Sequence, residues 1–156
     1  MTQLSNDSKI NIPTIIKICL DSYKDYPILG QLTACQAILE AGLARTPPSG
    51  LALRYNNLFG MKPGSIVREG TAGVILLDTK EYIKGKMVTV KQPFLRNKEL
   101  EDSIDQHRKL FDSLSRYAGL KTCKTIEEAC KEVYRAGYAT DPNYPSKLLS
   151  IYNKYL

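Results

Sequence analysis

Gln31-Leu-Thr-Ala-Cys-Gln-Ala-Ile-Leu-Glu40-Ala-Gly42 is the stretch on which the fold depends, and its pattern predicts a helix that is buried on almost every side. Small and apolar residues supply most of its surface, namely Leu32, Ala34, Cys35, Ala37, Ile38, Leu39 and Ala41. Only Thr33, Gln36 and Glu40 interrupt this surface, and their spacing places them on one narrow stripe. A buried helix whose single polar stripe ends in a carboxylate indicates the edge of a cleft rather than a solvated face.

Glu40 at a cleft edge would lose part of its hydration, and lost hydration raises the pKa of a carboxyl group. A raised pKa keeps the acid protonated and suits it for donating a proton to a leaving group. The alternative from this stretch alone is a partly buried glutamate that pairs with an arginine. The residues around Glu40 leave both interpretations open.

The composition is that of one globular domain. The chain has 156 residues, of which 43% are hydrophobic and 24% charged. Residues 1–156 are therefore expected to form a single domain that is large enough to bury a hydrophobic core. Residues 1–10 are polar and predict a loose arm without a secretion signal. The net charge of +6 suits a polyanion such as an anionic cell wall. Lysines and arginines are scattered, which argues against nucleic acid, and no apolar run approaches the roughly 20 residues needed for membrane insertion.

Cysteine and histidine usage predicts neither a metal site nor a cofactor. Cys19, Cys35, Cys123 and Cys130 form no CxxC pair, and the single histidine, His107, offers little for zinc. Without a secretion signal, reduced thiols are the expectation, although pairing of Cys123 with Cys130 stays open. His107 is expected to be a surface or helix-packing residue rather than a catalytic base.

Helices are expected on both sides of one short β region. A first helix is predicted to begin at Asn11 as its cap, and a connector over residues 26–30 leads to the Glu40 helix. A proline-rich loop follows at residues 45–50. The β region predicts a hairpin with one run ending at residues 82–83, a turn at 84–86 and a second run at 87–90. This segregated pattern predicts an α+β fold that is mainly helical.

Later helices carry recognisable end signals. Asp102 or Ser103 is expected to cap one helix, and Thr125 is expected to cap the next in a capping box. Gly137 is predicted to end that helix. Asp141 is expected to cap the last helix, with Pro142 in its first turn.

Residues 32–42, LTACQAILEAG, resemble the signature helix of the bacterial glucosaminidase domains of glycoside hydrolase family 73, typically Leu-Thr-x-Ala-Gln-Ala-x-Leu-Glu-Ser-Gly. The resemblance implies that Glu40 is the catalytic acid. The chain differs at Cys35, where alanine is common in the family, and at Ala41, where serine is common. Neither difference touches the proton donor.

Later segments carry the same resemblance. Residues 56–62, NNLFGMK, are similar to the family segment Asn-Leu-Phe-Gly-Ile-Lys, which packs beside the catalytic helix. In the hairpin the β-lobe carboxylate of the family falls on Glu81, and residues 136–148 match the family motif Ala-Gly-Tyr-Ala-Thr-Asp-Pro-x-Tyr-x-x-Lys-Leu. The chain departs from the family after Phe94, where Leu95 and Asn97 stand in place of arginine and tyrosine.

The resemblance implies a lysozyme-like fold in which the small β-hairpin lobe forms one side of a cleft. Its candidate site residues are the catalytic Glu40 and Glu81 and the substrate-binding Asn57, Phe59, Tyr82 and Tyr138. Tyr138 has an aromatic face to stack on a sugar and a hydroxyl for an acetamido group. Without the resemblance, Glu81 would be an exposed strand residue with weak ion pairs, and Tyr138 a core tyrosine.

The implied activity is that of an endo-beta-N-acetylglucosaminidase that cuts the glycan strands of peptidoglycan. Glu81 then acts as a base for water, as an electrostatic stabiliser, or not at all if the 2-acetamido group of the substrate attacks its own anomeric carbon. The alternatives are a muramidase, a lytic transglycosylase and a non-catalytic wall-binding virion protein. The leaderless single domain predicts a phage endolysin, released from the host cytoplasm to the cell wall, or a virion-associated lysin. The oligomeric state stays open.

Overall fold

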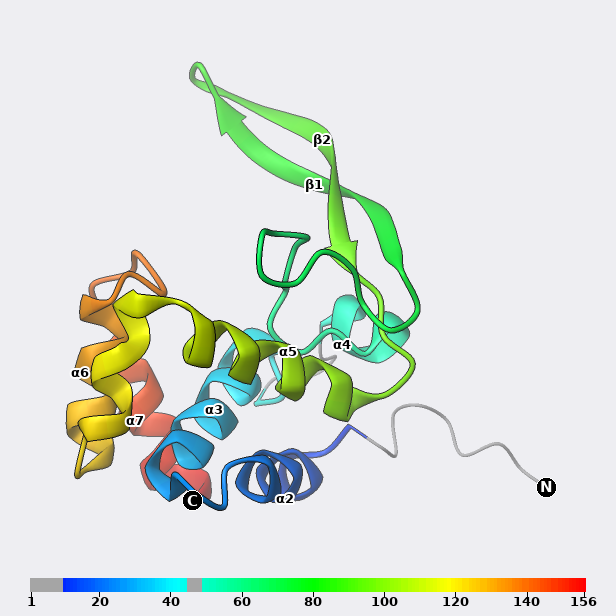
Figure 1. Cartoon of the computed structure of the whole chain (residues 1–156). Helices are drawn as coiled ribbons and strands as arrows, with labels where there is room; N and C mark the ends of the chain where they lie inside the picture. Colours follow the sequence, from blue (N-terminus) through cyan, green and yellow to red (C-terminus); the bar gives the residue numbers. More distant parts are fainter. Residues whose placement is uncertain (1–9, 45–48) are drawn as a thin grey trace.

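The computed structural model describes residues 10–44 and 49–156, so the predicted arm lies outside the described residues except for Ile10, which is buried. A helical body carries one projecting hairpin (Figure 1), which confirms the predicted α+β class. The body consists of α2 (Ile12–Ser22), α3 (Pro27–Glu40), α4 (Gly50–Tyr55), α5 (Leu100–Ser113), the 3-10 helix η1 (Ser115–Thr122), α6 (Ile126–Arg135) and α7 (Tyr144–Tyr155). The hairpin consists of β1 (Val74–Ile83) and β2 (Lys86–Leu95).

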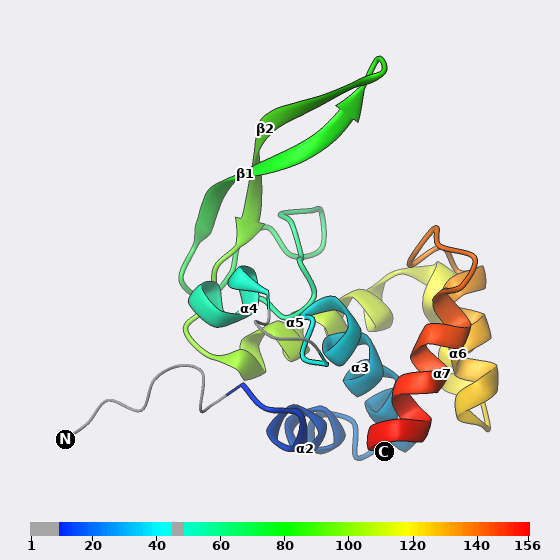
Figure 2. The same ribbon diagram turned by 180° about the vertical axis from the view of Figure 1, so that it is seen from behind.

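Helix α3 is the central helix of the body, in contact with α2, α6 and α7 (Figure 2). Every residue from Leu32 to Ile38 is buried, as the nearly continuous apolar pattern predicts. The helix begins at Pro27, so the expected connector at residues 26–30 is wrong. Proline fits the first turn of a helix because its missing N–H has no partner there in any case. Gly42 ends the helix region with a φ of +64°.

Two apolar clusters meet on α3, which explains why both of its faces are apolar. One cluster joins α3 to α5, η1, α6 and α7, with Leu32, Phe111 and Leu148 among its members. The other joins α3 to α2, α4, α5 and the segment that contains Leu58 and Phe59. Helix α3 therefore lies between the two halves of the core, and its C-terminal end packs against both.

The two strands pair antiparallel from Val74 opposite Leu95 to Ile83 opposite Lys86. Lys84 and Gly85 both have positive φ, 50° and 79°, as a two-residue type I′ turn requires. The hairpin is confirmed, but its turn is shorter and its strands are longer than the sequence predicts. Side chains alternate between exposed and half-buried along β1, so the hairpin has one face that is more shielded than the other.

Two buried asparagines tie the base of the hairpin to the body. Asn57 donates to the carbonyl oxygens of Met61 and Leu95 over 3.0 and 2.9 Å, and its Oδ1 accepts from the Met61 N–H. Asn97 Oδ1 accepts from the Thr71 N–H over 3.1 Å and from Gln106 Nε2 over 2.6 Å, and Asn97 Nδ2 donates to Gln106 Oε1 over 3.1 Å. Leu95 and Asn97, where the chain departs from the family pattern, are therefore buried residues of this base.

The helix caps follow the predictions in part. Asn11 and Thr125 cap α2 and α6 as expected, each through a side-chain oxygen. Helix α5 instead begins after Glu99, so the expected cap at Asp102 or Ser103 is wrong. Asp102 takes part from inside the helix, because its carboxylate accepts from the Glu99 N–H over 3.0 Å.

The last helix also begins later than predicted, at Tyr144, so Asp141 does not cap it. Its carboxylate accepts from the Asn143 N–H over 2.9 Å and pairs with Lys147 over 2.5 Å. Asp141 therefore orders the turn that leads into α7.

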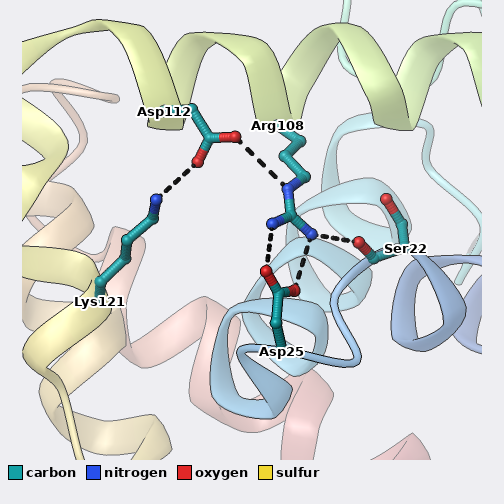
Figure 3. A network of polar contacts seen from close by, with 5 residues as sticks. All are labelled: Ser22, Asp25, Arg108, Asp112 and Lys121. Atoms are coloured by element: carbon teal, nitrogen blue, oxygen red, sulfur yellow. Dashed lines mark hydrogen bonds and ion pairs between the residues drawn. The ribbon is translucent and has the colours of Figure 1, made fainter.

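Arg108 of α5 fastens the connection between α2 and α3 (Figure 3). Its guanidinium binds both oxygens of Asp25 over 2.9 and 2.6 Å and also donates to the Ser22 carbonyl oxygen. Asp112 contacts Arg108 and Lys121 from the other side. This bidentate arrangement fixes the start of α3 against α5, and so the position of its far end, where Glu40 lies.

Candidate active site

Glu40, the last residue of α3, lines an open cavity of about 780 Å³. The cavity lies where the end of α3 meets the start of α7 and the segment before it. Its other lining residues are Leu39, Phe59, Leu110, Arg116, Tyr117, Tyr138, Ala139, Thr140, Asp141, Tyr144 and Lys147. Glu40 and Asp141 are the two carboxylates of this wall, and Asp141 is neutralised by Lys147. Glu40 is therefore the carboxylate available for chemistry.

The environment of Glu40 raises the pKa of its carboxyl group. The main cause is burial, which removes water from the charged form, and a hydrogen bond from the Tyr144 hydroxyl opposes it. The residue is exposed on the side of the cavity, so the acid is partly desolvated by the wall yet accessible to a ligand. No ion pair joins Glu40 to an arginine among the described residues. Of the two sequence interpretations, the structure favours the acid at a cleft edge.

Three buried side chains continue inward from Glu40 through hydrogen bonds. Tyr144 bonds to the Glu40 carboxyl group. Gln36 Nε2, one helical turn before Glu40, donates to the Tyr144 hydroxyl over 3.0 Å. Gln36 Oε1 contacts His107 Nε2 over 2.9 Å. The polar stripe of α3 thus connects the cavity with the interior of the body.

Aromatic rings form the wall behind these contacts. The His107 ring stacks on Phe59 with a centroid distance of 4.2 Å and meets Phe111 edge-on at 4.3 Å. Tyr138 stacks on Tyr144 at 6.0 Å. Burial lowers the pKa of His107 to about 3, so this imidazole is neutral at any pH at which the protein would act. His107 is a helix-packing residue, as one of its two sequence interpretations states, and not a surface residue.

The structure brings together three of the six predicted site residues, because Glu40, Phe59 and Tyr138 line one cavity. Asn57 is elsewhere. It is 1% exposed and engages the base of the hairpin with both ends of its amide. Such a side chain has nothing free to offer a sugar.

Glu81 and Tyr82 lie near the end of β1, and neither of them lines the cavity of Glu40. Strand β1 belongs to the hairpin that projects from the helical body (Figure 1). The Glu81 carboxylate accepts from Gln92 Nε2, and Gln92 Oε1 in turn accepts from Lys62 Nζ. Tyr82 points into solvent and is 72% exposed. The carboxylate of Glu81 is therefore held by Gln92 of the neighbouring strand, and it does not share the cavity with Glu40.

Sequence reasoning missed Gln36, Tyr144 and Arg116 as site residues. Gln36 carried a signal, since it shares the polar stripe of Glu40 one turn away. Tyr144 lies in the C-terminal match, but 108 positions separate it from Gln36, and only the fold joins them. Arg116 stands at the cavity with its guanidinium carbon 4.9 Å from the centre of the Tyr117 ring. Nothing in the sequence near Arg116 signals that position.

Some classes of site are missing from the described part of the chain. No three histidine, cysteine or acidic side chains within residues 10–44 and 49–156 come together as metal ligands. None of the helices described there has the length and apolar character needed to cross a membrane. Cys19, Cys35, Cys123 and Cys130 are all free, so the pair left open at Cys123 and Cys130 is not bonded.

Comparison with known proteins identifies relatives of similar sequence. The exo-glucosaminidase LytG of Bacillus subtilis is 33% identical over 85% of this chain and 46% of its own length. The peptidoglycan hydrolase FlgJ of Salmonella typhimurium is 32% identical over 77% of this chain and 37% of its own length. The chain therefore matches less than half of these curated relatives.

Solved structures share the fold of this chain. A glycoside hydrolase domain of FlgJ from Salmonella typhimurium matches with a TM-score of 0.67 and 26% identity over 97% of both chains. The catalytic domain of the autolysin Auto from Listeria monocytogenes matches with a TM-score of 0.75 over 99% of this chain and 87% of its own, at 23% identity. The lysozyme-like fold is thereby confirmed. A family model described as mannosyl-glycoprotein endo-beta-N-acetylglucosaminidase matches residues 16–156, and the chain belongs to this glucosaminidase family of glycoside hydrolases.

Proposed function

We propose that the protein hydrolyses the glycan strands of peptidoglycan at a bond of N-acetylglucosamine, with Glu40 as the general acid. The observation that carries this proposal is the position of Glu40, a carboxyl group of raised pKa at the open side of an aromatic cavity. Such an acid holds its proton until the leaving oxygen of a glycosidic bond takes it. The relatives named for peptidoglycan hydrolysis and glucosaminidase activity support the same substrate.

In this mechanism the cavity wall binds and orients the sugar. Tyr138 offers a ring face for stacking and a hydroxyl for the acetamido group, and Phe59 closes the apolar floor. Glu40 donates its proton to the glycosidic oxygen as the bond to the anomeric carbon breaks. The positive charge that develops on the sugar needs a partner, which is either Glu81 or the carbonyl oxygen of the 2-acetamido group. The placement of Glu81 outside the cavity favours the acetamido group.

A lytic transglycosylase is the second candidate function. It needs one acid and no base for water, which suits a cavity with Glu40 as its single unpaired carboxylate. The products distinguish the possibilities. New reducing-end glucosamine marks a glucosaminidase, reducing-end muramic acid a muramidase, and an anhydro sugar a transglycosylase.

The test compares wild type, Glu40→Gln and Glu81→Gln on purified peptidoglycan, with mass spectrometry of the released ends. We expect Glu40→Gln to lose at least about 100-fold in rate while keeping its fold. Glu81→Gln is expected to retain most activity if the acetamido group participates, and to lose activity if Glu81 is the base or stabiliser. If the wild-type protein sediments with the wall but releases no fragments, the proposed enzymatic activity is refuted, and the alternative of a wall-binding protein takes its place.

The mode and origin of the enzyme are finer proposals. Cleavage within the strand, as an endo enzyme, is compatible with a cavity that is open to solvent. The expected phage endolysin or virion-associated lysin stays a prediction, because the named relatives come from bacteria. Release of long glycan fragments early in digestion supports endo cleavage, and release of single disaccharides throughout supports exo cleavage.

A further inference from the structure

We infer that Tyr144, Gln36 and His107 form a one-way chain of hydrogen-bond donors that holds the Glu40 carboxyl group and directs its proton toward the cavity. All three are positioning residues in this inference, because they act on the reaction through Glu40. The inference rests on the proposed function of Glu40 as the acid. It goes further by assigning a role to buried residues on α3, α5 and α7.

The direction of the chain follows from the donors that each group possesses. An ionised carboxylate only accepts hydrogen bonds, so the Tyr144 hydroxyl uses its single O–H to donate a hydrogen bond to Glu40. The Tyr144 oxygen must then accept from Gln36, which makes its nearer atom the amide nitrogen, at 3.0 Å. Gln36 Oε1 is left facing His107, so His107 donates from Nε2 over 2.9 Å.

The histidine fixes the far end of this chain. His107 is fully buried among Phe59, Phe111 and Tyr138, and its Nδ1 has no hydrogen-bond partner among the described residues. A neutral imidazole carries one proton, and Gln36 requires that proton on Nε2. The unpartnered Nδ1 shows that no other group competes for the tautomer. His107 therefore acts as a fixed donor and releases no proton during the reaction.

The chain decides which oxygen of Glu40 carries the acidic proton. The oxygen that accepts from Tyr144 is occupied, so the proton of the neutral acid lies on the other oxygen, which is free for a ligand. When that proton is transferred, the new carboxylate already has a donor in place. Gln36 and Glu40 are separated by one helical turn, so α3 sets the distance between the amide and the acid.

Other charged groups near Glu40 must be kept constant in any test. The titratable or charged side chains on the cavity wall are Arg116, Tyr117, Tyr138, Asp141, Tyr144 and Lys147. Asp141 and Lys147 pair with each other, and Arg116 stacks on Tyr117. Removal of the Tyr144 hydroxyl alone leaves these charges unchanged. Because that hydroxyl lowers the pKa of Glu40, its loss should raise this pKa further.

The experiment is a titration of the Glu40 carboxyl carbon by NMR in ¹³C-labelled protein, with the Glu40→Gln spectrum to assign the signal. Tyr144→Phe keeps the buried ring and is expected to move the titration to higher pH. The pH–rate profile on peptidoglycan should shift its alkaline limb in the same direction, with kcat lowered about tenfold or more and KM little changed. An unchanged titration in folded Tyr144→Phe would overturn the inference.

A second variant tests the inner part of the chain. Gln36→Met has similar length without donors or acceptors, and it should shift the Glu40 titration less than Tyr144→Phe does. In the Tyr144→Phe background it should add nothing, because the chain acts through the Tyr144 hydroxyl. If Gln36→Met and Tyr144→Phe shifted the Glu40 titration independently and additively, the inferred chain of hydrogen bonds would be contradicted.

Tyr23→Phe is the matched control, because it also removes a hydroxyl from a buried tyrosine, but outside the chain. It should leave the Glu40 titration unchanged even if the melting temperature falls. The NMR readout does not need activity. Wild type that is inactive on peptidoglycan but retains the Tyr144-dependent titration would refute the proposed function and leave the chain intact.

Discussion

At the scale of single residues, Glu40 couples the stability of the fold to pH. Its pKa is raised in the folded state, so its stabilising contribution is complete below the pKa of the unfolded chain and is lost as pH rises through the folded pKa. Glu40→Gln removes the ionisable group, so the variant does not lose this contribution to stability as the pH rises. We expect the variant to gain melting temperature relative to wild type at about pH 7 and to match it at about pH 4. A variant that is less stable than wild type only at neutral pH would contradict the sign.

Asn57 gives a second prediction at this scale, because its buried amide makes three hydrogen bonds at the hairpin base. Asn57→Ala leaves the buried hydrogen-bond partners of this amide without a replacement partner. The free energy of unfolding should therefore fall by about 2–3 kcal/mol, measured by urea titration. Asn153→Ala, an exposed position on α7, is the matched control and should change little. Wall binding lost without any loss of stability would instead restore Asn57 as a substrate-binding residue.

At the scale of elements, the hairpin turn is not optimised for its own geometry. Lys84 adopts a φ of 50°, which asparagine and glycine tolerate better than lysine. Lys84→Asn should therefore stabilise the hairpin by about 0.5 kcal/mol and slow amide exchange along β1 and β2. Lys86→Asn removes the same charge outside the positive-φ positions and should give no such gain. Equal effects of the two variants would point to charge rather than backbone conformation.

The elements also show how far sequence reasoning reaches. The burial of α3 is readable because its apolar pattern is continuous, and the hairpin is readable because Gly85 and the β-branched runs are local signals. Element starts were less accurate. Glutamate is an uncommon cap, so the sequence pattern favours Asp102 or Ser103 over Glu99, although Asp102 takes part in the same capping box.

The candidate site was predictable only where one element carries it. Glu40 lies at the end of a single patterned helix, so its place at a cleft edge is one of the two interpretations that the spacing allows. The contact of Tyr144 with Gln36 depends on how α7 packs against α3, which no local pattern encodes. Asn57 shows the reverse case, since a polar residue in a matching segment is bound to the backbone rather than free for a ligand.

At the scale of the whole molecule, the net charge of +6 predicts electrostatic attachment to an anionic wall. Binding to purified walls should weaken steeply as salt rises from low concentration to about 0.5 M, because exposed charges are then screened. Cosedimentation at each salt concentration measures this, with uncharged chitin as the control. Binding to walls that is insensitive to salt would assign attachment to the cavity rather than to charge.

A tilt of the projecting hairpin about its base would displace Glu81, which lies near the far end of β1. Glu81 lies seven positions beyond Val74 at the base. At about 3.3 Å per residue, Glu81 is therefore about 23 Å from the base of the hairpin, and a tilt of about 10° would displace it by about 4 Å. That travel is close to the difference between retaining glycosidases, with carboxyl groups about 5 Å apart, and inverting ones, at about 9 Å. The hydrogen bonds of Asn57 and Asn97 at the base oppose such a tilt, so they would limit how far Glu81 moves relative to Glu40.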